Sequence, residues 1–216
     1  MADYGDKMTN FTENLCVNIL KDIDIKAKRN NIENKTNVDV ILQNGTKIDV
    51  QYSQNFAQYG DLRIDAISAY SKGVKGEGYY TNENIPESIV DKFNNLEKEK
   101  GIKIDKIGKC FQEDDYLDAT MILFYNDKLD IQDKTKQKPD SVMIITRNDI
   151  INYLNGDANK HFKNIKINNK KGLGDVHGSA FLPINAKDLK ENTNCFCGTI
   201  DELKEAKDKI KKYLSK

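Results

Sequence analysis

The chain lacks the hydrophobic segments of membrane and secreted proteins. In its 216 residues, no apolar run approaches the roughly 20 residues that a membrane-spanning helix needs. Residues 1–10 have neither a basic start nor an apolar stretch, so we expect no signal peptide. The sequence therefore predicts a cytoplasmic protein that makes no membrane contact.

Cysteine and histidine are scarce. The chain has four cysteines and two histidines. Cys16 and Cys110 stand alone, and Cys195 and Cys197 lie closer together than the pair of a zinc ribbon or a redox motif. We therefore expect reduced thiols and no His-rich zinc site. A metal in this protein would be held by carboxylates, which favour hard cations such as Mg²⁺ or Mn²⁺.

The chain also has no excess of one charge. Basic residues (Lys and Arg) and acidic residues (Asp and Glu) number 34 each, so no global basic signal points to nucleic acid. Net charge does not reveal positive charge that is confined to one cleft, so nucleic-acid binding stays open. Phosphate-loop, Gly-x-Ser-x-Gly and His-Glu-x-x-His motifs are missing from the sequence.

Apolar periodicity and turn signals predict a single α/β domain over residues 1–216. A helix is expected over about residues 8–22, where Asn10 and Glu13 have the spacing of a capping box. Residues 86–101, between a proline and a glycine, predict a second helix. Runs of β-branched and apolar residues predict strands over residues 38–42, 47–52, 62–70, 119–125, 142–146 and 180–184.

The remaining segments carry weaker signals. The polar region after the first helix has room for one short strand at residues 23–27. We interpret the lysine-rich residues 161–174 as a long surface excursion. Thr199 and Glu202 form a second capping box, which begins a terminal helix with one apolar face.

The strongest turn signal is the Asn-Gly dipeptide at residues 44–45. It separates two strand-like runs and predicts a hairpin. Asp39 lies in the first run, and Asp49 and Gln51 lie in the second. Side chains alternate along a strand, so Asp49 and Gln51 share a face, and Lys47 lies on that face too. These residues are the candidates for chemistry.

The turn decides whether the two acids meet. A two-residue turn places Asp39 opposite Val50, and the acids then point to opposite sides of the hairpin. A three-residue turn, with Gly45 in a left-handed bulge, places Asp39 directly opposite Asp49 instead. Two like charges in such a pair repel, so this register favours a bound cation. A metal site here requires the bulged turn or an equivalent distortion of the first strand.

These acids and the order of elements resemble the PD-(D/E)XK nuclease superfamily. In that family, acids on two neighbouring strands bind a divalent metal, and a lysine two residues after the second acid helps to place the attacking water. Asp39 matches the first acid and Asp49 the second, while Gln51 stands where the lysine is usual. Some restriction endonucleases of the superfamily carry glutamine there. Glu13 on the first helix matches, more loosely, an additional acidic metal ligand.

The resemblance implies a fold and a function. The fold is a restriction-endonuclease-like αβββαβ core over about residues 8–146, with a mixed sheet flanked by helices. Residues 147–216 then form a C-terminal extension that ends in a helix. The implied activity is hydrolysis of DNA phosphodiester bonds with Mg²⁺ or Mn²⁺. RNA is not excluded as a substrate, and many members act as homodimers.

Further basic residues are candidates for substrate binding. Arg63 shares a strand face with Asp65 and is a candidate contact to the nucleic-acid backbone. Lys72 and Lys75 in a glycine-rich loop are candidate phosphate contacts, and Lys47 is a candidate substitute for the missing lysine.

Other interpretations stay open. Aspartates beside an Asn-Gly turn also occur in ordinary hairpins, and Glu13 can act as a capping-box acid only. Gln51 cannot supply a positive charge, so the scaffold can be catalytically silent and serve as a nucleic-acid-binding or protein-interaction module. A third alternative is an unrelated α/β fold.

Overall fold

The computed structural model divides the chain into two compact units. It describes residues 4–30, 38–54, 61–69, 117–127, 129–133, 137–156, 166–172 and 175–215. The first unit combines residues 1–62, 113–150 and 185–216, and the second combines residues 63–112 and 151–184. The single domain expected from the sequence over residues 1–216 stays a prediction.

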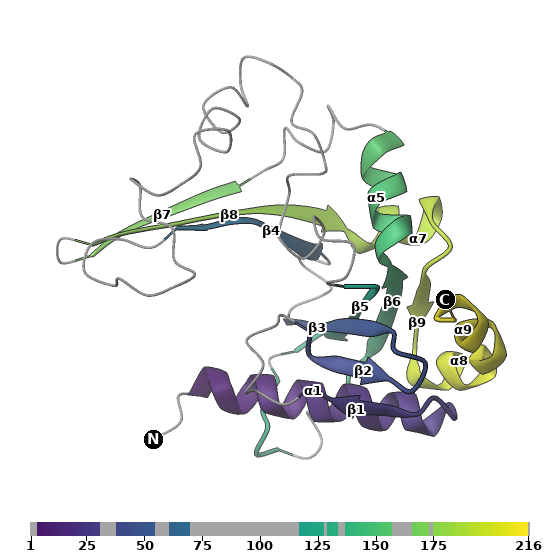
Figure 1. Cartoon of the computed structure of the whole chain (residues 1–216). Helices are drawn as coiled ribbons and strands as arrows, with labels where there is room; N and C mark the ends of the chain where they lie inside the picture. The colour runs from purple at the N-terminus through teal and green to yellow at the C-terminus, as the bar shows by residue number, and fades with distance from the viewer. Residues whose placement is uncertain are drawn as a thin grey trace. The chain divides into compact units, whose positions relative to one another are not determined.

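The first unit contains an open, mixed, six-stranded sheet (Figure 1). Strands β3 and β5 run parallel, and every other pair of neighbours in this sheet runs antiparallel. This confirms the predicted α/β class with a mixed sheet. In spatial order the strands are β1 (Ala27–Arg29), β2 (Val40–Leu42), β3 (Lys47–Gln54), β5 (Ala119–Tyr125), β6 (Ser141–Thr146) and β9 (Phe196–Gly198).

The most apolar runs of the sequence form the middle of this sheet. Every residue of β5 is buried, and so are the four inner residues of β6. Continuous apolar runs of this kind suit strands that are covered on both faces. The strands predicted at residues 119–125 and 142–146 are therefore confirmed.

Helix α1 (Tyr4–Asp22) packs against the sheet and contacts strands β1, β2, β3 and β5 (Figure 1). Cys16 and Leu20 of this helix are fully buried in the same apolar cluster as Ile48 and Met121 of the sheet. The helix starts well before Asn10, so the prediction of a capping box at this point is wrong. Met8 lies in the core at 1% exposure, and burial of this side chain favours the added turn.

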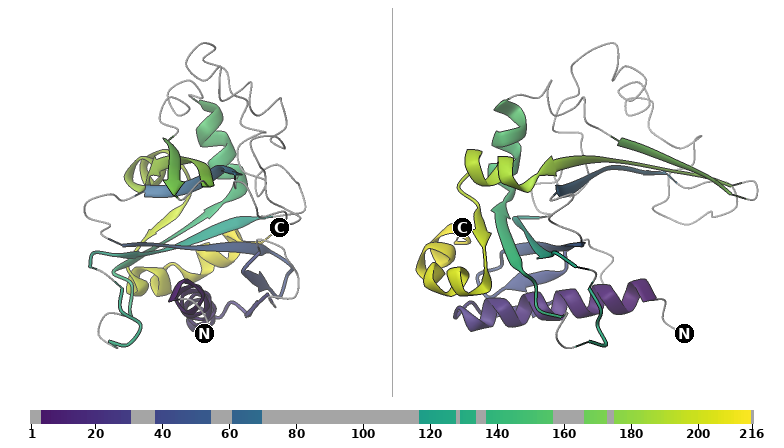
Figure 2. Two further views of the ribbon diagram at one scale, coloured as in Figure 1. Left: turned by 90° about the vertical axis from the view of Figure 1, so that its left-hand side faces the viewer. Right: turned by 180° about the vertical axis from the view of Figure 1, so that it is seen from behind.

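The C-terminal helices also belong to the first unit (Figure 2). Its C-terminal segment contains three short helices, α7 (Ala186–Asn192), α8 (Ile200–Glu205) and α9 (Lys207–Tyr213). The predicted capping box is confirmed, because Thr199 accepts from the Glu202 N–H and Glu202 accepts from the Thr199 N–H. The apolar face predicted for the terminal helix lies in the same core cluster as α1.

One predicted strand belongs to a different sheet. The sequence placed residues 62–70 as the third strand of the core, but β4 (Asp61–Ala69) pairs with β8 (Asp175–Asn185) in the three-stranded sheet β4-β8-β7. A short strand does follow the first helix, but β1 covers Ala27–Arg29 rather than the expected residues 23–27, and it forms the edge of the six-stranded sheet beside β2. Only long-range pairing distinguishes these two strands.

In the second unit, a segment that we expected to be a surface excursion is a strand. Residues 166–172, expected in a surface excursion, form strand β7 (Lys166–Gly172), which pairs antiparallel with β8 from Lys166↔Phe181 to Gly172↔Asp175. A polar strand carries no apolar alternation, so the sequence pattern missed it. Helix α5 (Arg147–Gly156) starts directly after β6. The helix predicted over residues 86–101 lies outside the described residues.

Within the described part of the chain, the longest apolar stretches are strands of the core. No helix there is long and apolar enough to cross a membrane.

Candidate metal and phosphate site

The hairpin between β2 and β3 has the bulged turn. Gly45 is left-handed with φ of 87°, its N–H donates to the Leu42 carbonyl at 3.0 Å, and the Leu42 N–H donates to the Thr46 carbonyl at 2.9 Å. The ladder pairs Val40 with Ile48. The printed pairing ends there, and the Asp39 N–H also donates to the Ile48 carbonyl, so Asp39 departs from the regular continuation of this register. The bulged turn is therefore present, while a position of Asp39 opposite Asp49 stays a prediction.

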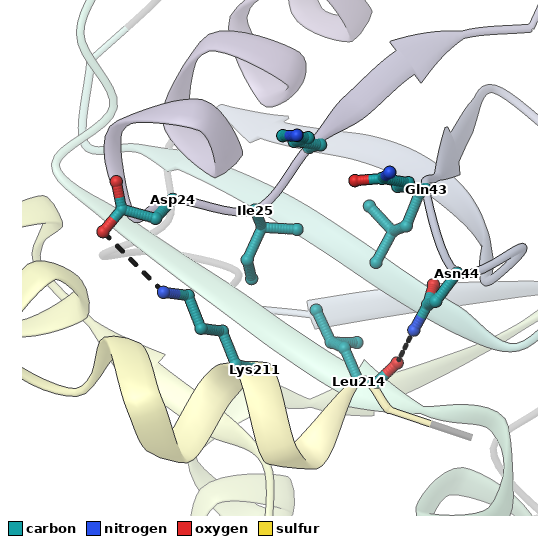
Figure 3. Close-up of a pocket in the computed structure, with 8 residues that line it drawn as sticks. Asp24, Ile25, Gln43, Asn44, Lys211 and Leu214 are labelled. Atoms are coloured by element: carbon teal, nitrogen blue, oxygen red, sulfur yellow. Dashed lines mark hydrogen bonds and ion pairs between the residues drawn. The ribbon is translucent and has the colours of Figure 1, made fainter.

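The turn is held from outside the hairpin. Asn44 donates its side-chain N–H to the Leu214 carbonyl at 3.0 Å, and the Thr46 hydroxyl donates to the same carbonyl at 3.0 Å. A pocket of about 200 Å³ lies between this turn and α9 (Figure 3). Lys211 pairs there with Asp24 at 3.7 Å. These contacts tie the C-terminal helix to the turn that sets the register.

Asp39 directly precedes β2 and bonds to the backbone of β3. Its N–H donates to the Ile48 carbonyl at 3.1 Å, and its Oδ2 accepts the Val50 N–H at 2.7 Å. Burial raises the pKa of the Asp39 carboxyl to about 6, helped by the negative charge of Glu13 and opposed by the Val50 hydrogen bond and by Arg29. A carboxylate that is costly to ionise without a partner favours a nearby cation.

Glu13 reaches the same region from α1. It is buried at 7% exposure and forms an ion pair with Arg29 of β1. The Arg29 Nε donates to Glu13 Oε2 at 2.7 Å, and Nη2 donates to Asn10 Oδ1 at 2.7 Å. Burial raises the pKa of the Cys16 thiol, and the charges of Asp39 and Glu13 raise it further. Two carboxylates and one guanidinium therefore gather over one end of β2.

Asp49 and Gln51 lie side by side on β3. The Gln51 Nε2 donates to Asp49 Oδ2 at 2.8 Å, which confirms the shared face that alternation predicted. Asp49 is paired with Thr120 of β5 in the parallel ladder, so these two side chains also share a face. Thr120 is fully buried, and its hydroxyl has no hydrogen-bond partner among the described residues. Buried hydroxyls of this kind are rare and call for a bonding partner.

The structure brings some predicted site residues together and leaves others apart or undescribed. Lys47 begins β3 on the strand face of Asp49, and its N–H donates to Asp118 Oδ2 at 2.7 Å. Arg63 lies in β4 of the other sheet. Lys72 and Lys75 lie outside the described residues. Sequence reasoning missed Arg29 and Thr120, because neither belongs to a motif and both take their places through strand pairing.

The residue types suit a hard cation. Asp39 and Asp49 offer carboxylate oxygens, and Mg²⁺ needs only one or two protein carboxylates because it keeps several waters. As they stand, no three His, Cys, Asp or Glu side chains of the described residues form a group that could hold a metal ion. Glu13 in particular is engaged by Arg29.

A second polar pocket of the first unit, about 360 Å³, lies near the first residues of β3. Tyr213 and Thr146 both donate their hydroxyls to Asp149 Oδ2 there. These hydrogen bonds join the start of α5 to α9. The polar side chains of the pocket are therefore explained by contacts that hold the fold together. It is lined by Thr46, Asp118, Thr146, Asn148, Asp149, Tyr213, Leu214 and Ser215.

Comparison with known proteins adds no relative: no family model, no curated protein and no solved structure matches the chain.

Proposed function

We propose that the protein is a metal-dependent nuclease of the PD-(D/E)XK type, which hydrolyses DNA phosphodiester bonds. Asp39 and Asp49 would hold Mg²⁺ or Mn²⁺, and Gln51 would orient the attacking water. The observation that carries the proposal is the bulged hairpin turn, which pairs Val40 with Ile48 and from which regular pairing would bring Asp39 opposite Asp49. Like charges in such a pair are unfavourable without a cation between them.

The order of elements supports the proposal. Helix α1 is followed by the antiparallel strands β1, β2 and β3, and then by β5, which runs parallel to β3. This order resembles that of the proposed nuclease core, with β1 in the place that we expected for residues 62–70. Asp49 lies on β3 and Asp39 directly precedes β2.

The electrostatics of Asp39 support a cation site as well. Its raised pKa, about 6, means that the carboxylate is poorly stabilised by the protein itself. The hydroxyl of Thr120, beside Asp49, is a buried polar group without a hydrogen-bond partner in the described part of the chain. A hydrated metal would supply oxygen and charge to both.

The chemistry follows from these parts. Asp39 and Asp49 would hold Mg²⁺, which would supply neutralisation of the phosphate charge and ionisation of a water. The water oxygen would then attack phosphorus as the bond from phosphorus to the leaving sugar oxygen breaks, and the proton given up by the water would balance the one taken up by the leaving oxygen. Gln51 can orient the water by hydrogen bonding but adds no charge. Lys47 is a candidate for that charge, since it shares the strand face of Asp49.

A second candidate function is a catalytically silent scaffold that binds nucleic acid or protein. The observation that favours it is Gln51, which hydrogen-bonds Asp49 where the family usually has a lysine. The proposed site still predicts Mn²⁺ binding in that case. Activity and metal binding are therefore measured separately.

The test uses isosteric variants. Plasmid and single-stranded DNA are incubated with Mg²⁺ or Mn²⁺ and with wild type, Asp39→Asn, Asp49→Asn or the control Asp127→Asn. Asp127 is an exposed aspartate just after β5. We expect cleavage by wild type and the control only, with a loss of about 100-fold or more in the two site variants. Titration calorimetry with Mn²⁺ runs beside it.

Three outcomes divide the alternatives. Cleavage that both site variants lose supports the nuclease. Mn²⁺ binding that needs Asp39 and Asp49, without cleavage, moves the assignment to the silent scaffold. Neither binding nor cleavage by the wild type rejects a metal site on this hairpin.

A further inference from the structure

The proposed site is short of positive charge on the protein side. Gln51 is neutral, and Glu13, Asp39 and Asp49 are all acidic. A phosphodiester that approaches two or three carboxylates needs a cationic contact besides the metal. A basic side chain near the acids would provide this contact.

Arg29 forms an ion pair with one of these acids, Glu13, and its charge acts on a second, Asp39. The chain takes its positive charge almost entirely from lysine, and its arginines are Arg29, Arg63 and Arg147. Arg29 ends β1, and its guanidinium is fixed by Glu13 on one side and by Asn10 on the other. Two anchors from one helix hold the planar group in one orientation.

The guanidinium of Arg29 has N–H donors left for one more hydrogen-bond partner. Of its five N–H donors, those on Nε and Nη2 make the contacts with Glu13 and Asn10, and Nη1 has no partner among the described residues. The Arg29 side chain is 25% exposed, whereas that of Glu13 is 10% exposed. The charge also acts on Asp39, whose pKa it lowers. Arg29 is therefore held, partly open to solvent and next to the proposed metal ligand.

We propose that Arg29, positioned by Glu13 and Asn10, binds a phosphate of the DNA backbone beside Asp39 and supplies a positive charge to the proposed site. This deepens the proposed function and rests on it. Arginine suits the role because its planar fork matches phosphate oxygens in a bidentate way. In this arrangement Glu13 is a positioning residue for Arg29.

The test measures how many phosphates the protein neutralises. Binding of a fluorescent DNA duplex is followed by anisotropy at several salt concentrations, with Ca²⁺ in place of Mg²⁺ and with the duplex checked for cleavage. Each Lys or Arg contact to a phosphate contributes about 0.9 to the slope of log K against log salt. A merely structural ion pair would not change this slope.

Four proteins are compared. In the double variant Glu13→Gln, Arg29→Met both charges of the pair are removed, so no buried charge is left alone. Arg29→Lys keeps the positive charge but lacks the planar guanidinium that binds two phosphate oxygens at once. Lys28→Met is the control, because Lys28 is exposed on the same strand. Circular dichroism confirms that each variant is folded before binding is measured.

We expect the double variant to bind about tenfold more weakly, with a slope smaller by about 1. Arg29→Lys should keep the slope, and Lys28→Met should keep both slope and affinity. If the double variant behaves like Lys28→Met while the wild type binds or cleaves DNA, the role of Arg29 is rejected and the nuclease proposal stands. If the wild type neither binds nor cleaves DNA, both proposals fail.

Discussion

The carboxyl group of Asp39 should make the protein less stable at neutral pH than it would be without that charge. Burial and the charge of Glu13 raise its pKa to about 6, against an ordinary value of 3.8. Replacement by asparagine removes the charge and keeps an oxygen that can accept the Val50 N–H. We therefore predict that Asp39→Asn is more stable than the wild type at pH 8.

The magnitude and the sign follow from proton linkage. Between pH 4 and pH 6 the folded wild type binds more protons at this group than the unfolded chain does, so its stability falls as the pH rises through that window. The difference between 3.8 and about 6, at 1.36 kcal/mol per pKa unit, corresponds to about 3 kcal/mol. Because the carboxyl keeps some contact with water, we expect a gain of about 1 to 3 kcal/mol for the variant.

The assay is urea unfolding at pH 4 and pH 8 in buffer with a chelator. The quantity of interest is the difference between variant and wild type at pH 8 minus the same difference at pH 4, because other titrating groups cancel in it. Asp127→Asn controls for the loss of one negative charge. Saturating Mg²⁺ should then restore stability to the wild type alone, by about 2.7 kcal/mol at 100 times the dissociation constant.

Two results would refute this reasoning. Equal differences at both pH values would mean that the Asp39 carboxyl is not destabilised in the folded protein. A variant that is less stable than wild type at pH 8 would mean that the carboxylate already has a favourable partner in the protein, and the argument for a cation would lose its electrostatic support.

Three further changes test the turn, a helix cap and the motif. Gly45→Ala should lower the free energy of unfolding by about 1 kcal/mol, because its φ is 87°, whereas Gly156→Ala, where no left-handed backbone is needed, should not. Thr199→Ala should cost about 1 kcal/mol through the lost capping box, unlike Thr9→Ala on an exposed helix position; urea unfolding measures all four. Gln51→Lys should raise metal-dependent cleavage about tenfold or more by adding positive charge, and an unchanged rate would contradict the role of this position.

Part of the candidate site could be predicted from sequence. The acids and Gln51 were found because strand alternation and an Asn-Gly turn are local signals, and the condition of a bulged turn could be stated in advance. The sequence alone could not choose between the two registers. That choice also depends on Leu214, whose carbonyl accepts from Asn44 and Thr46 across 170 and 168 residues of chain.

The partners of the acids could not be predicted. Arg29 contacts Glu13 because β1 pairs with β2 and α1 crosses that edge of the sheet, and no spacing in the sequence encodes such a contact. Thr120 lies beside Asp49 because β5 joins β3 in parallel after a long connection. Both residues take these positions only when the strands of the sheet have paired.

By itself, the sequence determined the α/β class, the buried strands β5 and β6, the hairpin turn and the cap of the C-terminal helix. Each of these depends on side-chain periodicity or on hydrogen bonds between residues a few positions apart. Tertiary structure decided that β1 rather than β4 completes the sheet, and that Asp39, Glu13 and Arg29 meet. Those outcomes depend on which surfaces bury each other, and burial is a property of the whole fold.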